Sequence, residues 1–396
     1  MGWLGLDDTD SLSGGCTTEV FHRLLLALPE GVTLGTPRLV RLWPFAQRRT
    51  RGNAALSIEL ITNNESTLLS HLDEWWTVNI SPLSGRVTPS QQSNREQSPT
   101  SPGMVWFAQK PPADLYWKAV SQEVSLEELP LPTKGWGNFG RIGATAAVAW
   151  PADHGTWEAI AWRVDDALGV RNIDLDTLDA IEKNPDIVLS RDPRKGKQLI
   201  APRGESPVLF GIRSLQQHSA HEACERLLAA SGTEMANGWR VFYTNQATGD
   251  HLTDSYVADV ITSQVHPQRK HVKLHTTSGT MVFFAEGGPL NSLARWFREG
   301  DRIEVKGLID TEGVIHAEQC RLLHSVPRKK QRPLCPECGV RMKSMGQGQG
   351  VRCPQCKHIM DDFWEMIEPS PPYLGWVEPP LDARRHLSRP LSWTEE

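Results

Sequence analysis

The sequence predicts a multidomain α+β protein that ends in a small cysteine-rich module. Its 396 residues exceed what one ordinary core holds, and a typical domain size of about 150 residues gives about two to four domains. The first two thirds mix strand-like and helix-like runs, residues 255–323 consist mainly of short strands, and four of the seven cysteines cluster near the C-terminus. Hydrophobic residues make up 39% and charged residues 22% of the chain, which excludes fibrous and wholly disordered classes.

The N-terminal segment has a strand–loop–helix pattern. Trp3 to Leu6 is a short apolar strand that leads into the acidic loop Asp7-Asp8-Thr9-Asp10-Ser11. A helix opens at Cys16-Thr17-Thr18-Glu19 and keeps helical spacing of apolar residues. A polar loop between a strand and a helix N-terminus is typical of phosphate-handling sites.

The remainder of the first domain contains further strands and helices. Strands are predicted at Val32 to Trp43 and Asn53 to Ile61, a helix at Thr67 to Trp76, a short helix after Pro111 and a small-residue helix at Ala144 to Ala149 that ends before Pro151. Ser81 to Gly103 has almost no apolar residues and is predicted to be a mobile insertion, since it cannot bury a core face.

A second α+β region and a barrel follow. Strand-like runs at Ala159 to Val164 and Pro207 to Ile212, with a helix at His218 to Ala230, predict the α+β region. Five short strands are then expected at Ser255 to Ser263, His271 to His275, Thr280 to Phe284, Arg302 to Ile309 and Val314 to Leu322, with a helix at Leu290 to Arg298. A helix between the third and fourth of five strands favours an OB-fold, and the alternative is a different small barrel.

The cysteine spacing predicts a structural zinc site. Cys335-x-x-Cys338 is followed, fourteen residues further on, by Cys353-x-x-Cys356, and two such knuckles complete a tetrahedral thiolate set. Four protein ligands leave no open position for water, so this Zn²⁺ is expected to be structural. The other three cysteines, Cys16, Cys224 and Cys320, are interpreted as ordinary buried or semi-buried thiols, and all seven are expected to be reduced.

Charge is segregated along the chain. The formal net charge is -5, yet the segment 321–360 holds nine Lys or Arg and one acid, Glu337. Such a basic stripe in an acidic protein is typical of a surface that binds a polyanion. The candidate RNA-binding residues are Arg328, Lys329, Lys330, Arg332, Arg341 and Lys343.

The acidic loop has two interpretations. Crowding Asp7, Asp8 and Asp10 at the end of an apolar strand is costly unless a cation offsets their charge, which favours a site for Mg²⁺ and a nucleotide. The alternative is an exposed acidic turn that caps the next helix. Thr17 and Thr18 lie at or near the helix N-terminus, where backbone N–H groups attract phosphate, and simple capping is the alternative there too.

Common nucleotide-binding motifs do not fit. Gly135 to Gly143 contains Gly-x-Gly-x-x-Gly, but the preceding residues are acidic and Pro-rich, which excludes a Rossmann strand and leaves a phosphate-cradling loop or a packing turn. No Walker loop occurs. Ser13 to Thr18 is similar to the loop of N-type ATP pyrophosphatases, but Thr17 replaces the usual Asp, which disfavours that family. Arg48, Arg49 and Arg51 form a basic cluster for phosphates, or else a solvated loop.

Neither secretion nor membrane insertion is expected. The N-terminus is acidic where a signal peptide needs a basic start, and no apolar segment reaches the roughly 20 residues that span a bilayer. The cytoplasm is the expected location, with no membrane contact and no obligate protein partner.

An ordered set of motifs resembles one family over essentially the whole chain, the archaeal tRNA(Ile) 2-agmatinylcytidine synthetases. The motifs are Gly5-Leu6-Asp7-Asp8-Thr9-Asp10-Ser11, Gly15-Cys16-Thr17-Thr18, Arg51-Gly52-Asn53-Ala54, Gly135-x-Gly137-Asn138, Pro207-Val208-Leu209-Phe210-Gly211-Ile212-Arg213, Tyr243-Thr244-Asn245-Gln246 and Asp250-His251-Leu252. One such motif is weak, whereas seven in the same order are specific.

The resemblance implies four domains and a tail. These are a kinase-like ATP-binding catalytic domain (1–152, with an insertion at about 81–103), a ferredoxin-like domain (153–254), an OB-fold β-barrel (255–325), a zinc ribbon (326–366) and a C-terminal tail (367–396).

The resemblance also implies the reaction. ATP would phosphorylate the C2 oxygen of the wobble cytidine in the CAU anticodon of tRNA(Ile), and the amine of agmatine would then displace the phosphate. Agmatidine, AMP and phosphate would be the products, and the modified anticodon would read AUA codons. ATP, Mg²⁺ and structural Zn²⁺ are the expected cofactors, and tRNA(Ile) and agmatine the expected partners.

By position, the resemblance implies roles for individual residues. Asp7, Asp8 and Asp10 would be catalytic and hold Mg²⁺ and the triphosphate, and Thr17 would be autophosphorylated. ATP would be bound by Thr9, Ser11, Thr18, Arg51, Asn53, Gly137, Asn138 and Arg141. The family has Arg before Gly where this chain reads Gly140-Arg141, a departure that bears on the role of Arg141.

Two other functions fit parts of the sequence. An OB-fold with a basic zinc ribbon would by itself indicate a non-catalytic RNA-binding protein. Ligation of lysine in place of agmatine to the same cytidine is the second alternative.

Overall fold

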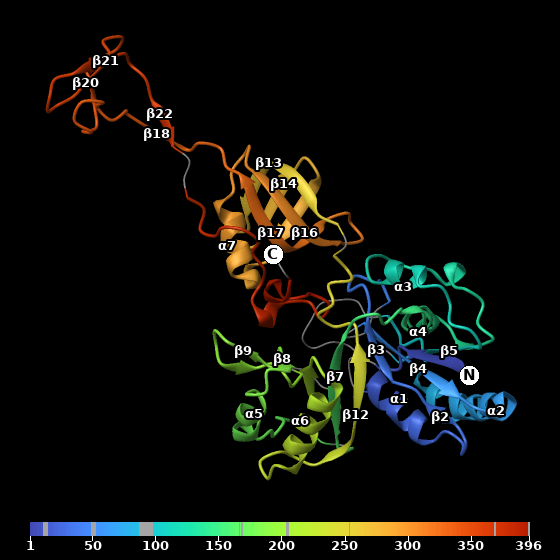
Figure 1. The fold of residues 1–396 in the computed structure, drawn as a ribbon. Coiled ribbons are helices and arrows are strands. Elements are labelled where there is room, and N and C mark those ends of the chain that lie inside the picture. The colour runs from blue at the N-terminus through green and yellow to red at the C-terminus, as the bar shows by residue number, and fades with distance from the viewer. Residues whose placement is uncertain are drawn as a thin grey trace. The chain divides into compact units, whose positions relative to one another are not determined.

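The computed structural model describes residues 1–10, 15–48, 53–86, 98–165, 167, 169–202, 206–252, 254–367 and 370–394. The chain divides into two compact units (Figure 1). Unit 1 comprises Met1–Thr253, Leu308–Glu312 and Pro380–Glu396, and unit 2 comprises Asp254–Gly307 and Gly313–Pro379. Among the described residues no helix is long and apolar enough to cross a membrane.

Unit 1 is built on one ten-stranded sheet, with the strand order β6-β5-β1-β4-β3-β12-β7-β11-β8 and β2 paired with β4 (Figure 1). Its strands are β1 (Gly2–Asp7), β2 (Thr33–Leu34), β3 (Arg38–Arg41), β4 (Ala54–Ile61), β5 (Gly103–Phe107), β6 (Lys134–Gly137), β7 (Thr156–Arg163), β8 (Ile187–Val188), β11 (Val208–Ser214) and β12 (Ala236–Thr244). A separate hairpin joins β9 (Arg191–Asp192) to β10 (Lys197–Gln198).

Helices cover both faces of this sheet. They are α1 (Thr17–Leu26), α2 (Glu65–Trp75), α3 (Asp114–Ala119), α4 (Gly140–Ala149), α5 (Leu175–Ile181) and α6 (Gln217–Ala229), with short 3-10 or π segments at Trp76–Ile80, Ser81–Leu83, Leu126–Glu128, Leu381–Ala383 and Leu391–Trp393. Because side chains alternate along a strand, Leu56 and Ile58 of β4 pack toward α1 and α2 while Ala55 faces α4. The acidic loop therefore follows a strand, β1, in the middle of a sheet that is covered on both faces.

The sheet continues from the N-terminal α+β region into the second one. β3 pairs in parallel with β12, with Tyr243 opposite Arg38 and Thr244 opposite Leu39, whereas β12 and β7 pair antiparallel. The two regions predicted as separate domains therefore share backbone hydrogen bonds inside unit 1.

Unit 2 begins with a closed five-stranded barrel in the order β13-β14-β15-β17-β16. Its elements are β13 (Tyr256–Val265), β14 (Val272–Thr276), β15 (Gly279–Phe283), η4 (Ala285–Gly287), α7 (Pro289–Trp296), β16 (Arg302–Ile309) and β17 (Ile315–His324). Fully buried Leu274, Phe283, Phe297 and Ile303 fill its core. This barrel, with its helix between the third and fourth strands, confirms the predicted arrangement of elements.

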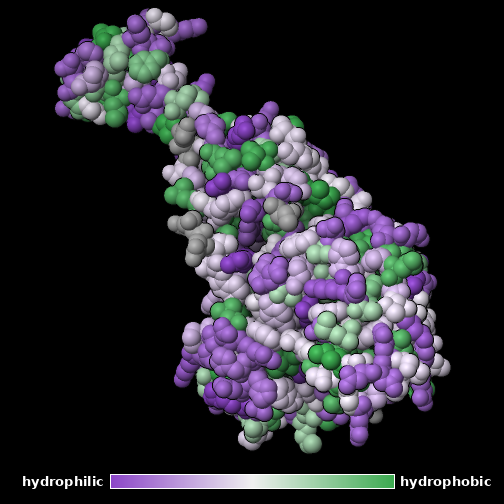
Figure 2. Space-filling view, turned by 45° about the vertical axis from the view of Figure 1, so that its right-hand side comes forward, coloured by the Kyte–Doolittle hydropathy of each residue, from purple (hydrophilic) through white to green (hydrophobic). Residues whose placement is uncertain are grey.

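The cysteine-rich module has little apolar core. Its strands are β18 (Lys329–Gln331), β19 (Lys343–Ser344), β20 (Val351–Arg352), β21 (Ile359–Met360) and β22 (Glu365–Ile367). Only Cys335, Met342, Val351 and Cys353 form its buried cluster. In Figure 2, hydrophilic and hydrophobic residues are mixed over the visible face of the module at the upper left, as expected of a domain held together by metal rather than by a core.

Three local predictions need correction. The strand predicted from Val32 to Trp43 is two strands, β2 and β3, because Pro37 cannot donate to a ladder. The glycine run is not one loop: Gly135 and Gly137 belong to β6, and α4 begins at Gly140 rather than at Ala144. β6 pairs antiparallel with β5, which agrees with the rejection of a Rossmann unit.

The base of the predicted insertion is ordered. Gly85 N–H donates to Thr100 O at 2.8 Å, and Thr100 N–H donates to Arg86 O at 3.0 Å. These bonds join the two sides of the insertion before β5 begins. The prediction that the rest is mobile concerns residues 87–97, which lie outside the described residues.

Candidate active site

The acidic loop is shaped by backbone N–H groups. Asp7 is the last residue of β1, and its Oδ1 accepts from the N–H of Asp8 at 2.7 Å. Asp8 has a φ of 60°, a left-handed conformation that Asp tolerates better than most residues. Its Oδ2 accepts from the N–H of Ser101 at 2.7 Å. The insertion base therefore fixes the second carboxylate of the loop.

The first turn of α4 lies directly against Asp7. A Cβ atom on Gly143 would overlap Asp7 Oδ2, and one on Gly140 would lie 2.7 Å from Asp7 O. Glycine at these two positions is thus required by the close approach of the helix to the acidic loop. The carboxylate meets the N-terminal end of α4, where backbone N–H groups favour negative charge.

Burial dominates the titration of the acidic pair. Desolvation, followed by repulsion from Asp8, raises the pKa of Asp7 well above its usual value. Desolvation raises the pKa of Asp8 to about 7, although the N–H of Ser101 opposes the shift, while Asp10 adds repulsion. The pair thus holds protons that a bound cation would displace.

The two threonines at the start of α1 have different surroundings. Thr17 Oγ1 lies 3.4 Å from Asp10 Oδ1. Thr18 Oγ1 instead accepts from Trp162 Nε1 at 3.1 Å and lies 2.9 Å from Cys16 Sγ. Thr18 is therefore held by the protein itself, while Thr17 faces the acidic loop.

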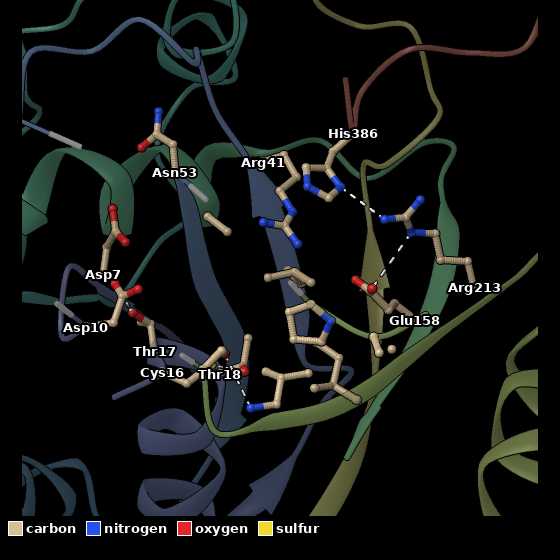
Figure 3. A pocket seen from close by; sticks show the side chains of 18 of the residues that line it. Asp7, Asp10, Cys16, Thr17, Thr18, Arg41, Asn53, Glu158, Arg213 and His386 are labelled. Carbon is tan, nitrogen blue, oxygen red and sulfur yellow. Dashed lines mark hydrogen bonds and ion pairs between the residues drawn. The ribbon is translucent and has the colours of Figure 1, made fainter. Parts of the chain in front are cut away.

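A cavity of about 380 Å³ opens beside this loop. Figure 3 shows Asp7, Asp10 and Thr17 on one side of it and Glu158, Arg213 and His386 on the other. The first side comes from the N-terminal region, and the second from β7, β11 and the C-terminal tail. The cavity thus lies between two regions that share the sheet.

A polar network forms the far wall. Gln246 Nε2 donates to Glu158 Oε2, which fixes the orientation of the amide because a carboxylate only accepts. Gln246 Oε1 then faces His386 Nδ1 at 3.0 Å, and Arg213 Nη2 lies 3.1 Å from the same nitrogen. Arg41, desolvation and Arg213, in that order, hold the pKa of His386 well below its usual value. The two neighbouring guanidinium groups therefore disfavour a positive charge on His386.

A second cavity, of about 310 Å³, lies on the other side of the acidic loop. Of the residues that the structure describes, four line both cavities: Asp7, Asp8, Arg48 and Asn53. Phe139, Gly140 and Gly143 at the start of α4 line only the second cavity, and the Arg48 guanidinium lies 3.9 Å from the centre of the Phe139 ring. The acidic pair is thus the boundary between two chambers.

The predicted ATP-binding residues separate into groups. Ser11 and Arg51, like Arg49, lie outside the described residues. Asn53 lines both cavities. Thr9 is buried, and its hydroxyl has no hydrogen-bond partner among the described residues.

Gly137, Asn138 and Arg141 line neither chamber and form the tight β6–α4 turn. A Cβ on Gly137 would overlap Pro102 O, and Asn138 N–H donates to that same oxygen at 3.1 Å. The close packing of this turn explains why residue 137 is a glycine.

The four ribbon cysteines converge. Cys335 Sγ lies 3.3 Å from Cys356 Sγ, and Cys338 Sγ lies 3.4 Å from Cys353 Sγ and 3.6 Å from Cys356 Sγ. Zn–S bonds of about 2.3 Å place tetrahedral sulfurs about 3.8 Å apart, so the set fits zinc. Within the described part of the chain it is the one group of three or more His, Cys, Asp or Glu residues whose ligand atoms all lie within 4.8 Å of one another. The three loop carboxylates do not form such a group.

Some of the predicted RNA-binding residues contact other parts of the protein, whereas others are exposed. Arg328 contacts Asp301 and Trp296 and is a structural residue of the barrel. Arg332 pairs with Asp362, and Arg341 approaches Glu365 at 3.7 Å. Three lysines are exposed on short strands: Lys329, Lys330 and Lys343.

Several residues of this site were not predicted. Ser101 lies in a segment interpreted as an insertion, and Glu158, Trp162 and His386 belong to none of the motifs. The sequence signal for the far wall was the run Tyr243 to Gln246, whose last residue organises Glu158 and His386. Arg48 was predicted, as part of the basic cluster.

Comparison with known proteins identifies the same family along the chain. Residues 3–139 match the family model described as TiaS TCKD domain, residues 138–251 the TiaS FLD domain and residues 332–367 the TiaS C-terminal zinc ribbon domain. The tRNA 2-agmatinylcytidine synthetase TiaS of Pyrococcus horikoshii is 31% identical, over 98% of this chain and 96% of that protein. Its counterpart from Methanosarcina mazei is 30% identical with the same coverage.

Solved structures agree with this result. The crystal structure of apo TiaS superposes with a TM-score of 0.77 at 27% identity and covers all of this chain and 98% of that one. The complex of TiaS with its isoleucine tRNA and ATP has a TM-score of 0.76 at 27% identity, with the same coverage. The chain belongs to the TiaS family of tRNA(Ile) 2-agmatinylcytidine synthetases.

Proposed function

We propose that this chain joins agmatine to C2 of the wobble cytidine in the CAU anticodon of tRNA(Ile), in a reaction driven by ATP. The observation that carries this proposal is the half-buried acidic pair Asp7 and Asp8, which lies beside Thr17 and lines two cavities. The chain that holds it is similar to tRNA 2-agmatinylcytidine synthetases over 98% of its length. A similar solved structure contains an isoleucine tRNA and ATP.

The chemistry explains why ATP is needed. The C2 oxygen of cytidine is a poor leaving group at neutral pH, and phosphorylation converts it into a good one. The primary amine of agmatine then attacks C2 and the phosphate departs. Release of AMP means that ATP gives up two phosphoryl groups: one activates the C2 oxygen and leaves as phosphate, and the other would pass to Thr17 and leave as a second phosphate on hydrolysis by water. The modified anticodon would read AUA codons.

The two chambers suit two ligands. We assign ATP to the chamber beside α4, because the start of a helix favours phosphate and the Arg48 guanidinium lies at its edge. The acceptor cytidine, once it has left the anticodon stack, and the amine would occupy the larger chamber. The acidic pair between them would then face both the phosphoryl donor and its acceptor.

Asp7, Asp8 and Asp10 would hold Mg²⁺, which would supply positive charge to the triphosphate. Their fit to a cation rests on two half-buried carboxyls, Asp7 and Asp8, whose pKa values are raised by desolvation. Crowded carboxyls of this kind ionise readily only when a cation is present. Thr17 is the better candidate for autophosphorylation, because Thr18 already accepts a hydrogen bond from Trp162.

We also propose the finer domain assignments. Residues 1–152 would be kinase-like, 153–254 ferredoxin-like and 255–325 an OB-fold, followed by the ribbon at 326–366 and the tail. The five-stranded barrel order and its single helix support the OB-fold. Exposed Lys329, Lys330 and Lys343 would contact tRNA, and the protein would work in the cytoplasm with that substrate.

One assay tests the function. The full chain is incubated with agmatine, radiolabelled ATP and a CAU-anticodon transcript, and both AMP release and the mass of the wobble nucleotide are measured. The proposal expects agmatinylation of that nucleotide and AMP release, both abolished by Asp8→Asn. Binding of tRNA without either product would indicate the non-catalytic alternative, and a product formed with lysine but not with agmatine would indicate the other ligase.

A further inference from the structure

A third cavity, of about 350 Å³, opens between the β9–β10 hairpin and the C-terminal tail of unit 1. It continues from the larger of the two chambers, since both are lined by five shared residues: Leu199, Ala201, Pro202, Arg213 and His386. None of the described residues of the acidic loop, Asp7 to Asp10, lines it. We call this cavity the tail groove.

The tail groove is cationic. Among the described residues that line it are Lys197 of β10, Arg213 of β11, and Arg384 and Arg385 of the tail, with Asp382 as the single acid. Asp382 is already neutralised from outside the groove: Arg194 Nη2 lies 2.8 Å and Lys195 Nζ 2.7 Å from its carboxylate oxygens. A concave surface with this surplus of positive charge attracts an anion.

The tail wall is fixed in place rather than loosely laid on the surface. Ala247 N–H donates to His386 O and Gly249 N–H donates to Leu387 O, both at 2.8 Å. Leu387 is 3% exposed and packs in the cluster that holds α3 and α4 on the sheet. The groove is therefore organised before any ligand arrives, which lowers the entropic cost of binding.

The charge and its position select the kind of ligand. The nucleotide triphosphate is assigned to the smaller chamber beside α4, next to the acidic pair, where a cation can bind. The groove instead adjoins the larger chamber, to which we assign the everted base. A nucleotide whose base is everted into the chamber still carries phosphates on both sides, and these must lie on the protein surface that adjoins the chamber.

We propose that the tail groove binds the phosphodiester backbone of the RNA beside the everted cytidine, with Lys197 and Arg384 as its phosphate ligands. The inference rests on the proposed function, and it places part of the substrate RNA in unit 1. It gives the C-terminal tail a role in substrate binding, and the tail lies beyond residue 367, where the ribbon match ends.

The test uses the full chain with both Lys197→Ala and Arg384→Ala. The affinity of this double variant for tRNA is measured at several salt concentrations and compared with that of the parent. Removing one phosphate interaction with a single strand should reduce the slope of log K against log salt by about 0.7, so the double variant should show a reduction of about 1.4. The reduction should be equal for CAU-anticodon tRNA and for a tRNA with another anticodon, because backbone contacts do not read sequence. Lys197→Arg with Arg384→Lys keeps the charge and should retain the original slope. Lys183→Ala is the matched control, a lysine of unit 1 outside the groove.

An unchanged slope in the double variant would overturn the proposal. So would a loss of ATP affinity with tRNA affinity intact, because the groove would then hold nucleotide phosphates. The experiment measures tRNA binding and requires no catalysis. A negative result for the groove can therefore be distinguished from a negative result for the proposed activity. If the double variant unfolds, Arg384→Gln alone should still lower the slope by about 0.7.

Discussion

Asn245 forms hydrogen bonds with the main chain of Arg41 through both ends of its side-chain amide. Its Oδ1 accepts from Arg41 N–H at 2.7 Å, and its Nδ2 donates to Arg41 O at 2.9 Å. Asn245 follows β12 and Arg41 ends β3, so this pair continues the parallel contact between the two strands. Since Arg41 lines the larger chamber, the amide joins the two α+β regions at the site itself.

Asn245→Ala should therefore destabilise unit 1. The change leaves both main-chain groups of Arg41 without this partner, at a cost of about 1–3 kcal/mol for each buried group. The free energy of unfolding from urea titration measures the loss. Asn79→Ala removes one exposed bond to Trp75 O and should cost less than about 0.5 kcal/mol. Equal losses in the two variants would contradict a structural role for the Asn245 pair.

Asp8→Asn should stabilise the protein at high pH while abolishing agmatinylation. Because the pKa of Asp8 is about 7 in the folded state against an ordinary value of 3.8, the folded chain binds more protons between these pH values. Stability then falls as pH rises from about 4 to about 7. Asparagine cannot lose a proton, so the melting temperature of the variant should exceed that of the parent at pH 8 and approach it near pH 4. A lower melting temperature at pH 8 would refute the burial argument.

Mg²⁺ affinity should depend on pH for the same reason. A cation must displace the protons of Asp7 and Asp8, so its affinity should weaken as pH falls below about 7. Isothermal titration of Mg²⁺ with ATP present, at pH 6, 7 and 8, measures this. An affinity independent of pH would place the cation away from these carboxyls.

Thr17→Ala and Thr18→Val should fail in different ways. Thr17→Ala should remove phosphate incorporation from labelled ATP with little change in melting temperature, and Thr17→Ser should restore it. Thr18→Val leaves the Trp162 indole N–H without its acceptor and should lower stability by about 1–3 kcal/mol. Mass spectrometry of the peptide that contains both residues identifies the site. Phosphate on Thr18 would reverse the assignment.

Gly143→Ala should impair catalysis more than folding. The added methyl would overlap Asp7 Oδ2, so the carboxylate must move away from its place between the chambers. We expect kcat to fall by about tenfold or more in the AMP assay, because a small misplacement of a reacting group is costly. Gly31→Ala adds a methyl at a turn with nothing within 4 Å and should leave kcat unchanged, even though its φ of +83° adds strain.

Cys335→Ser should remove zinc and weaken tRNA binding. The ribbon has four buried residues in its cluster and depends on the metal for its fold. Metal analysis should find one zinc per parent chain and none in the variant. Cys224→Ala, in the core of unit 1, should retain the zinc. Full tRNA affinity in the zinc-free variant would contradict a role for the ribbon in binding.

Local patterns predicted most elements correctly. The helix at the Cys16–Thr18 motif, the barrel strands and the two cysteine knuckles depend on residues close together in the chain, where periodicity and spacing carry the information. The glycine run was misread because strand and helix meet inside it. The helix starts at Gly140 because β1 and β5 approach it closely there, which no local pattern records.

The sequence by itself determined the zinc site, the order of elements, and the acidic loop with Thr17 as candidates for nucleotide chemistry. Only the tertiary structure decided four other features. The strand β3 pairs with β12, Ser101 donates a hydrogen bond to Asp8, Trp162 donates one to Thr18, and the C-terminal tail places His386 beside Gln246 at the chamber. The last three of these contacts join residues that are 93, 144 and 140 positions apart in the chain. Burial and pairing at such separations depend on the packing of the whole sheet, so the raised pKa values and the two chambers arise only once the chain has folded.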